Sequence, residues 1–357
     1  MRTSCIAAVL VMFAAGAASA GEVELSGGMT MVGQWIAAGD EASLPDGRIG
    51  EMSSSFDLEA QTQFSPRLRG YLHLEASAGG GIDAHVTMYG AANADAAGTA
   101  AAEVSEAWLE GNLGAGWTVF VGKADVSAIV DANDVAGDET AQFLNASFRN
   151  STAAFFPMDN AAAAWLSWVP EDGPVEAVVG WAEADADWQF VFEDPYLFGE
   201  VGLRLGPSGE RGRVGIYAWS ASGVNTPLAG TVGSTSGWGL SARLNMTEGL
   251  KVFARYGQRD ASDFEVAAAY SVGAELSHMA WAGEDDVFAV AFGTSILGDK
   301  YRAATPGAAD ESILEAYCRL KLSDGLALSP SVQTVWNAGG VRSDALVLVG
   351  LRAQADF

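Results

Sequence analysis

The chain has 357 residues, and 45 acidic residues against 19 Lys and Arg give it a formal net charge of −26. This balance excludes nucleic acid as a partner, because phosphate binding needs a basic surface. Glycine is abundant, with 43 residues, while two cysteines are too few for a fold held by disulfides. Short apolar alternations recur along the chain, which is typical of a sheet with many strands.

The first 20 residues have the features of a cleaved secretory signal peptide. Arg2 precedes an apolar stretch from Ile6 to Ala18, and residues 18–20 are Ala-Ser-Ala, the small residues of a cleavage site. We predict one mature domain, 21–357, with 18 basic and 45 acidic residues and a net charge of −27. No later apolar run approaches the ~20 residues that a transmembrane helix needs.

The segment Met52–Phe64 shows the strand pattern most clearly. Phe56 and Leu58 alternate with Asp57 and Glu59, which directs one face toward lipid and the other toward water. Sixteen strands of this kind are predicted along the chain. The first three cover Met29–Ala37, Met52–Phe64 and Leu68–Ala76.

The predicted connections alternate between short and long, as an up-and-down barrel requires. The short turns are predicted at 65–67, 114–116, 170–174, 206–212, 246–249 and 323–325, with a longer one at 278–286. The long, external connections are predicted at 39–51, 77–103, 123–160, 182–195, 221–236, 258–264, 297–312 and 337–344. An even number of strands closes the sheet without an unpaired edge in lipid. The sequence therefore predicts an all-β fold, a transmembrane antiparallel up-and-down β-barrel of 16 strands, wide enough for an aqueous channel.

The chain ends on an alternating strand whose last residue is aromatic. Leu351, Ala353, Ala355 and Phe357 share the apolar face of this strand. A terminal Phe on such a strand resembles the signal that outer-membrane barrel assembly machinery reads. We predict that role for Phe357, with the barrel placed in the outer membrane of a Gram-negative cell.

An ordered set of motifs resembles the OprB-type carbohydrate-selective porins. The resemblance runs from about Val104 to Phe357. Three departures occur: Ala338 stands where the family usually has Pro, Cys318 interrupts a tyrosine pair, and the N-terminal third is poorly matched. The motifs are 122–125, 131–133, 138–148, 216–219, 250–257, 284–287, 314–317 and 328–333.

The resemblance implies that the connection Lys123–Asn160 folds into the barrel and narrows the channel. Its polar residues suit such a place, although a solvated surface loop would have much the same composition. The predicted constriction residues are Asp131, Asn133, Asp134, Asp138, Glu139, Gln142, Asn145 and Arg149.

Strand alternation also predicts which side chains line the lumen. Arg255 should lie closest to mid-height among the arginines of the eighth to eleventh strands, and inward Tyr71, Tyr217, Trp219 and Tyr317 should offer apolar faces to a sugar ring. Lys123 fits neither face, so we expect its strand to end there or to carry a bulge. The predicted lumen wall consists of Glu200, Arg204, Arg213, Tyr217, Trp219, Arg243, Arg255, Glu315, Arg319, Gln333 and Arg352.

These features predict a porin for passive diffusion of small hydrophilic solutes, with carbohydrates as the implied cargo. A general cation-preferring porin without sugar selectivity is the alternative, because an anionic mouth concentrates cations. Only His73, beside Glu75, has an inward register suited to general-base chemistry, and we predict no enzymatic activity.

No cofactor is predicted, and no metal site either, because His and Cys do not cluster and the acidic loops lack a calcium-loop spacing. The expected partners are sugars, outer-membrane lipid, lipopolysaccharide and the barrel assembly machinery. The sequence leaves open whether the protein is a monomer or a homotrimer.

Overall fold

The computed structural model describes residues 22–39, 50–96, 101–157, 160–206, 209–226, 228, 230–260, 264–279, 283, 285–340 and 345–357. The predicted signal segment, 1–20, lies outside these residues. Among the described residues, no helix is long and apolar enough to cross a membrane.

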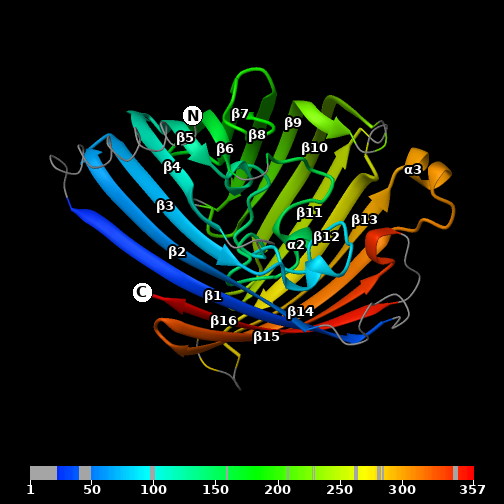
Figure 1. The fold of residues 1–357 in the computed structure, drawn as a ribbon. Coiled ribbons are helices and arrows are strands. Elements are labelled where there is room, and N and C mark those ends of the chain that lie inside the picture. The colour runs from blue at the N-terminus through cyan, green and yellow to red at the C-terminus, as the bar shows by residue number, and fades with distance from the viewer. Residues whose placement is uncertain are drawn as a thin grey trace.

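Sixteen antiparallel strands form one closed barrel, as predicted from the sequence (Figure 1). Each strand pairs with its neighbours in the chain, and β1 closes the ring against β16, with Gly28 opposite Asp356. The strands are β1 (Val23–Ala38), β2 (Gly50–Ser65), β3 (Leu68–Ala78), β4 (Ala101–Gly114), β5 (Trp117–Ala124), β6 (Ala161–Trp168), β7 (Val175–Glu183), β8 (Pro195–Leu205), β9 (Gly212–Thr226), β10 (Thr231–Asn245), β11 (Leu250–Arg259), β12 (Val266–Leu276), β13 (Val287–Leu297), β14 (Glu311–Ser323), β15 (Leu326–Trp336) and β16 (Leu346–Asp356).

The outer surface is apolar because every strand alternates. On β2, Phe56 and Leu58 are exposed outward, while Asp57 points inward and pairs across the ladder with Glu75 of β3. The same rule gives the inward face to Arg255, which pairs with Ser271 of β12. Because successive side chains of a strand point to opposite faces, residues that face lipid alternate with residues that face the lumen.

Three predicted strand ends differ clearly from the structure. β1 begins at Val23 rather than Met29, and the predicted long connection 221–236 is wrong, because β9 and β10 extend through most of it as a hairpin with Thr226 opposite Thr231. The extension is rich in Gly, Ser and Thr, which form a ladder with one another here but show no apolar alternation. The sequence period alone therefore made these three strands too short.

Lys123 lies on β5, which continues to Ala124, so the strand does not end at the lysine. The bulge is in β4, where the ladder with β3 passes over Ser105 between Glu106 and Val104. The Lys123 ammonium donates to the Val104 carbonyl at 2.7 Å. A bulge leaves a backbone acceptor without its ladder partner, and the lysine supplies a donor for it.

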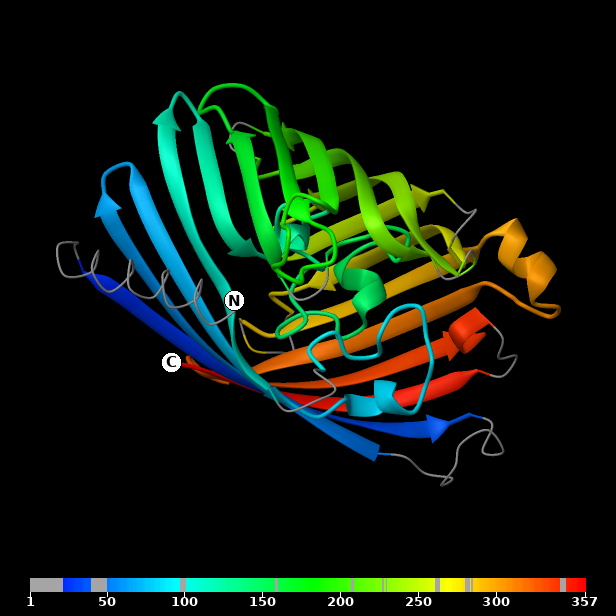
Figure 2. The same cartoon turned by 45° about the horizontal axis from the view of Figure 1, so that its top comes forward.

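Two of the long connections, which lie at the barrel end opposite the short turns, fold into the barrel (Figure 2). We call residues 79–96, between β3 and β4, the first inner segment, and residues 125–157, between β5 and β6, the second inner segment. The second contains the one-turn helix α2 (Ala146–Arg149), whereas α3 (Asp299–Ala304) lies at the rim between β13 and β14. The sequence prediction of an external connection at 77–103 is therefore wrong.

The apolar core of the protein lies inside the barrel, between the inner segments and the wall. Ile82 of the first inner segment and Phe143 of the second are buried in one cluster with Phe253 and Ile313 of the strands. In a second cluster, Val130 packs against the wall near Tyr217. The lumen of this part of the barrel is thus filled with packed side chains.

Candidate functional site: the channel constriction

A buried ion pair fixes the second inner segment to the wall. Arg255 Nε of β11 lies 3.2 Å from Asp131 Oδ1, and its Nη2 donates to the Asp131 carbonyl at 3.1 Å. The guanidinium also donates to the Phe148 carbonyl. The Asp131 carboxylate accepts from the Ser151 amide at 2.8 Å, and the Asp131 amide donates to Glu200 at 3.0 Å. The side chains of Asp131 and Arg255 are 0% and 1% exposed, so each charge depends on the other.

A second attachment lies on β14 and β16. The Glu315 carboxylate accepts from the amides of Leu144 at 2.8 Å and Asn145 at 3.0 Å. Arg352 donates to the carbonyls of Glu139 at 2.9 Å and Gln142 at 2.8 Å. Hydrogen bonds between a charged side chain and backbone amides or carbonyls are strong and directional. These bonds therefore hold the second inner segment in one position.

Further contacts complete these attachments. Asn145 donates to Gln333 Oε1 at 3.4 Å, and Asn133 donates to the Ala242 carbonyl at 3.1 Å. Asn145 is fully buried, as is Gln333. Several residues predicted to line the pore and several predicted to form its wall therefore contact one another instead of water. They are Asp131, Asn133 and Asn145 of the segment and Glu200, Arg255, Glu315, Gln333 and Arg352 of the strands.

The aromatic residues predicted to face sugars are, with one exception, covered. Tyr217, Trp219 and Tyr317 point inward but are only 1%, 3% and 3% exposed. Phe143 packs edge-on against Tyr317 with ring centroids 5.1 Å apart. The prediction that these three rings contact solute is wrong. Strand alternation predicts which way a side chain points, but it does not predict whether another segment covers that side chain. Tyr71 alone of the four remains partly exposed.

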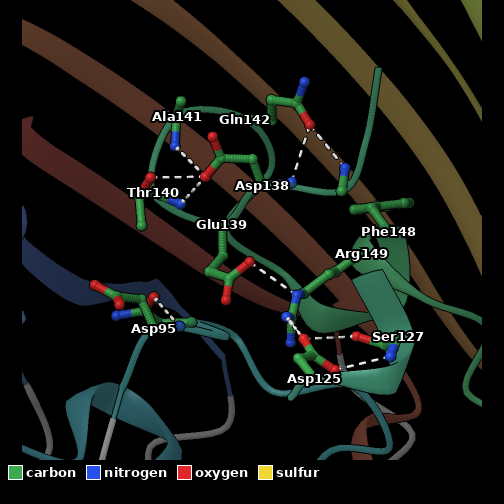
Figure 3. A network of polar contacts seen from close by, with 12 residues as sticks. Asp95, Asp125, Ser127, Asp138, Glu139, Thr140, Ala141, Gln142, Phe148 and Arg149 are labelled. Carbon is green, nitrogen blue, oxygen red and sulfur yellow. Dashed lines mark hydrogen bonds and ion pairs between the residues drawn. The ribbon is translucent and has the colours of Figure 1, made fainter. Parts of the chain in front are cut away.

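The surface of the second inner segment carries an ion cluster (Figure 3). Arg149 lies between two carboxylates, with its Nη2 2.6 Å from Asp125 Oδ2 and its Nε 2.8 Å from Glu139 Oε2. Gln142 folds the chain by accepting from the Asp138 amide at 3.0 Å. These side chains are more exposed than the buried attachments, and Arg149 retains 31% exposure.

Asp95 of the first inner segment lies beside this cluster (Figure 3). Its Oδ2 accepts from Ser55 of β2 at 2.9 Å. Burial, together with the charges of Glu139, Asp57 and Glu75, raises the pKa of Asp95 to about 7, while the hydrogen bond from Ser55 opposes the rise. Burial also raises the pKa of Glu139, while the Arg149 guanidinium opposes that rise. The region therefore concentrates negative charge around one arginine.

On the opposing wall, most inward residues of β2 to β4 are partly exposed, whereas Ser53 and Ser55 of β2 are buried. The exposed residues include an ion pair of His73 with Asp57 at 2.8 Å. Tyr71 stacks on Trp108 with centroids 5.0 Å apart, and the Arg69 guanidinium lies 5.2 Å from the Trp108 ring centre. We define the open wall as Asp57, Glu59, Arg69, Tyr71, His73, Glu75, Glu106, Trp108 and Glu110.

The sequence analysis placed Tyr71 and His73 inward but did not select the open wall as a site. The alternation of polar and apolar residues indicates the inward face of β2 and β3, where inward positions are almost all polar. It does not indicate the inward face of β4, because the bulge at Ser105 shifts the alternation between Val104 and Glu106. Single-strand periodicity therefore does not predict that Trp108 and Tyr71 share a face.

The remaining arginines predicted for the lumen wall lie toward the short-turn end. Glu176 bridges Arg213 at 2.5 Å and Arg204 at 3.6 Å. Arg243 pairs with Asp134 of the second inner segment at 2.6 Å, and Arg319 donates to Gln354 at 3.1 Å. These arginines are therefore paired or hydrogen-bonded on the inward face.

Phe357 ends β16 on the outer surface. Its backbone makes two hydrogen bonds with Gly27 of β1, each of 3.0 Å, and its ring lies 6.1 Å from that of Phe56. A Cβ on Gly27 would come within 2.7 Å of the Phe357 ring, so glycine makes room for it. The ring itself is exposed, in a position that another protein or lipid can reach.

A closed sixteen-stranded barrel with apolar outer strands and inward-folded connections is the architecture of an outer-membrane porin. Residues 213–357 match the model of the family described as carbohydrate-selective porin, OprB family. The fold is therefore that of outer-membrane porins, and residues 213–357 are similar to the OprB family.

Solved structures agree with this fold. The chain is similar to the high-pH structure of Pseudomonas putida OprB, with a TM-score of 0.77 and 14% identity over 94% of each chain. It is also similar to the outer-membrane channel DcaP of Acinetobacter baumannii, with a TM-score of 0.61, 14% identity and coverage of 94% of this chain and 97% of that one. For Salmonella typhi OmpF the TM-score is 0.60 at 10% identity, over 95% and 99% of the two chains. A comparison with curated proteins gave no match.

Proposed function

We propose that the protein conducts small carbohydrates through a passage between the open wall and the surface of the second inner segment. The observation that carries this is the contrast in exposure inside the barrel. The residues of the open wall are partly exposed, while Arg255, Glu315 and Arg352 are buried under the inner segments. Solute therefore meets the open wall on one side and the cluster of Asp125, Glu139 and Arg149 on the other.

The chemistry of both sides suits a hydroxyl-rich solute. Carboxylates such as Asp57 and Glu139 accept hydrogen bonds from sugar hydroxyls, and Arg149 donates to them. The stacked pair of Tyr71 and Trp108 presents a broad ring surface for the apolar face of a pyranose. The match of residues 213–357 to the model of a carbohydrate-selective porin family supports the same class of solute.

A Trp108→Ala substitution tests this proposal. It removes the larger ring of the stacked pair, so the concentration of disaccharide that blocks half the current through a single channel should rise by about 5- to 30-fold, the equivalent of 1–2 kcal/mol. Conductance in salt alone should change little, because the loop attachments are untouched. The matched control is Trp238→Ala, a tryptophan on the outer surface. Equal sugar block in wild type and Trp108→Ala contradicts the proposed path.

A general cation-preferring porin is the second candidate, and the acidic residues around the passage favour it. A narrow passage lined by Asp57, Glu75 and Asp95 stabilises cations by an electrostatic potential that water screens poorly. Liposome swelling separates the two candidates. A sugar-selective channel admits glucose faster than a neutral amino acid of similar size, whereas a general porin admits both at rates set by size.

We further propose that residues 1–20 are removed on export, that Phe357 serves as the assembly signal, and that lipid and lipopolysaccharide surround the apolar outer strands. Deleting Phe357 should lower the amount of folded barrel in the outer membrane while leaving export intact, as judged by heat-dependent gel mobility. The mass of the mature protein shows whether it begins at Gly21. Native mass spectrometry in detergent distinguishes a monomer from a homotrimer.

A further inference from the structure

The connection between β7 and β8 gathers three carboxylates on the side of the long connections. Oxygen atoms of Glu183, Asp185 and Asp187 all lie within 4.8 Å of one another, the one such group of three acidic, His or Cys side chains among the described residues. Acidic side chains often gather on exposed loops without a ligand. The burial of Glu183 distinguishes this group.

Glu183 is 1% exposed, although it carries a carboxylate. Its Oε2 accepts from the Trp188 amide at 3.1 Å, while its Oε1 is buried without a hydrogen-bond partner in the described part of the chain. A buried carboxylate oxygen with no partner costs a large desolvation energy. Such an atom, close to two further carboxylates, has the chemistry of a cation ligand.

No positive side chain in this connection offsets the charge. Residues 182–195 contain five acidic residues and no Lys, Arg or His. Asp194 adds to Asp185 and Asp187 as a charge that acts on the Glu183 carboxyl. Like charges this close repel one another, and a bound cation removes the repulsion.

The backbone brings these alternate residues together by an unusual path. Ala186, Trp188 and Phe190 have φ angles of 51°, 61° and 54°, in the left-handed region that residues other than glycine seldom adopt. The Ala184 amide donates to the Asp194 carbonyl at 2.8 Å and closes the base of the loop. The chain therefore curls so that side chains two residues apart converge on one point.

We propose that Glu183, Asp185 and Asp187 bind a calcium ion at the mouth of the barrel. The protein ligands are oxygens alone, which excludes a preference for the softer transition metals. Ca²⁺ accepts six to eight oxygens in flexible geometry, so water and backbone carbonyls complete its shell, whereas Mg²⁺ demands near-octahedral ligands. The sequence analysis predicted no metal because the spacing, with acidic residues at alternate positions, lacks the later ligands of a calcium loop.

Terbium luminescence tests the site in the full barrel. Tb³⁺ replaces Ca²⁺ at oxygen sites and is excited through a nearby tryptophan, here Trp188 or Trp181. Protein refolded in detergent without lipopolysaccharide should show saturable Tb³⁺ emission that Ca²⁺ displaces at about 10⁻⁴–10⁻³ M, the range of extracellular calcium sites. Mg²⁺ should displace it at least tenfold less well.

Two variants and one control make the outcome decisive. Glu183→Gln and Asp187→Asn should each weaken Ca²⁺ binding at least tenfold, with heat-dependent gel mobility showing that the barrel is folded. The control is Glu171→Gln with Asp172→Asn, two exposed acidic residues in the turn between β6 and β7, which should leave binding unchanged.

Unaltered Ca²⁺ affinity in both carboxylate variants overturns the proposal, as does Mg²⁺ displacement equal to that of Ca²⁺. Should Glu183→Gln fail to fold, Asp185→Asn, whose side chain is exposed, replaces it in the same test. The proposal does not depend on the sugar passage, because the measurement reports binding and not transport.

Discussion

The two sides of the barrel interior differ in what their charges do. On β8 to β16, charged side chains such as Arg255, Glu315 and Arg352 are buried and bind the backbone of the second inner segment. On β2 to β4, charged side chains such as Asp57 and His73 pair with neighbours and stay partly exposed. The same inward register thus produces an anchoring side and a more exposed side, which is the conducting side in the proposed path. Lumen-facing orientation alone does not make a residue part of the channel surface.

The largest expected effect comes from removing an anchor. Arg255→Met leaves Asp131 buried without its counter-ion, which costs about 3–5 kcal/mol. The second inner segment should then detach from β11, raising single-channel conductance and lowering the unfolding temperature.

Planar-bilayer recordings and thermal gel shifts measure this effect. Lys251→Met is the matched control, since Lys251 lies on the same strand as Arg255 but pairs with Glu275 of β12 and is 38% exposed. A conductance for Arg255→Met equal to that of wild type would show that Arg255 is not an anchor.

A smaller effect is expected from neutralising the conducting side. Asp57→Asn with Glu75→Gln removes two negative charges that face water inside the barrel. The ratio of cation to anion permeability, measured from reversal potentials in a salt gradient, should fall about two- to fivefold. The same double change should leave conductance at high salt nearly unaltered, because screening weakens exposed charges there. Glu171→Gln with Asp172→Asn, outside the passage, controls for total charge.

Much of the barrel was predictable from the sequence, because alternation repeats locally. β2 and β3 were predicted nearly to their ends, and the number of strands was confirmed. The first inner segment was not predictable in this way. Its Ala92 carbonyl accepts from Gln34 at 3.1 Å and from Gln333 at 2.8 Å, residues that lie 58 and 241 positions away. Only the closed ring brings those partners together.

The candidate site shows the same limit. The sequence placed Arg255 and Tyr217 on the inward face, and both point inward. It did not indicate that the second inner segment covers them, because coverage depends on where Asp131 and Phe143 lie after folding. Polar loop residues look alike in sequence whether they end as buried anchors, like Asn145, or at the surface, like Asp138.

The smallest and most specific effect concerns pH. Asp95 has a pKa of about 7, raised by burial and by Glu139, Asp57 and Glu75, so its carboxyl is neutral below that pH and charged above it. Cation preference should therefore increase by about twofold between pH 6 and pH 8. In Asp95→Asn the contribution of residue 95 to this pH-dependent change in cation preference should disappear, because an amide does not titrate. The amide oxygen can still accept the hydrogen bond from Ser55 Oγ.

The free energy of unfolding should also depend on the titration of Asp95, and it should fall as the pH rises. The raised pKa means that the folded state holds the Asp95 proton more tightly than the unfolded chain does. The contribution of Asp95 to stability is thus fully present below its usual pKa of ~4 and is lost as pH rises toward 7. Denaturant unfolding of wild type and Asp95→Asn across this range measures the difference. If the two proteins lose stability in parallel between pH 4 and 7, the Asp95 carboxyl titrates normally and another group controls any pH-dependent conduction.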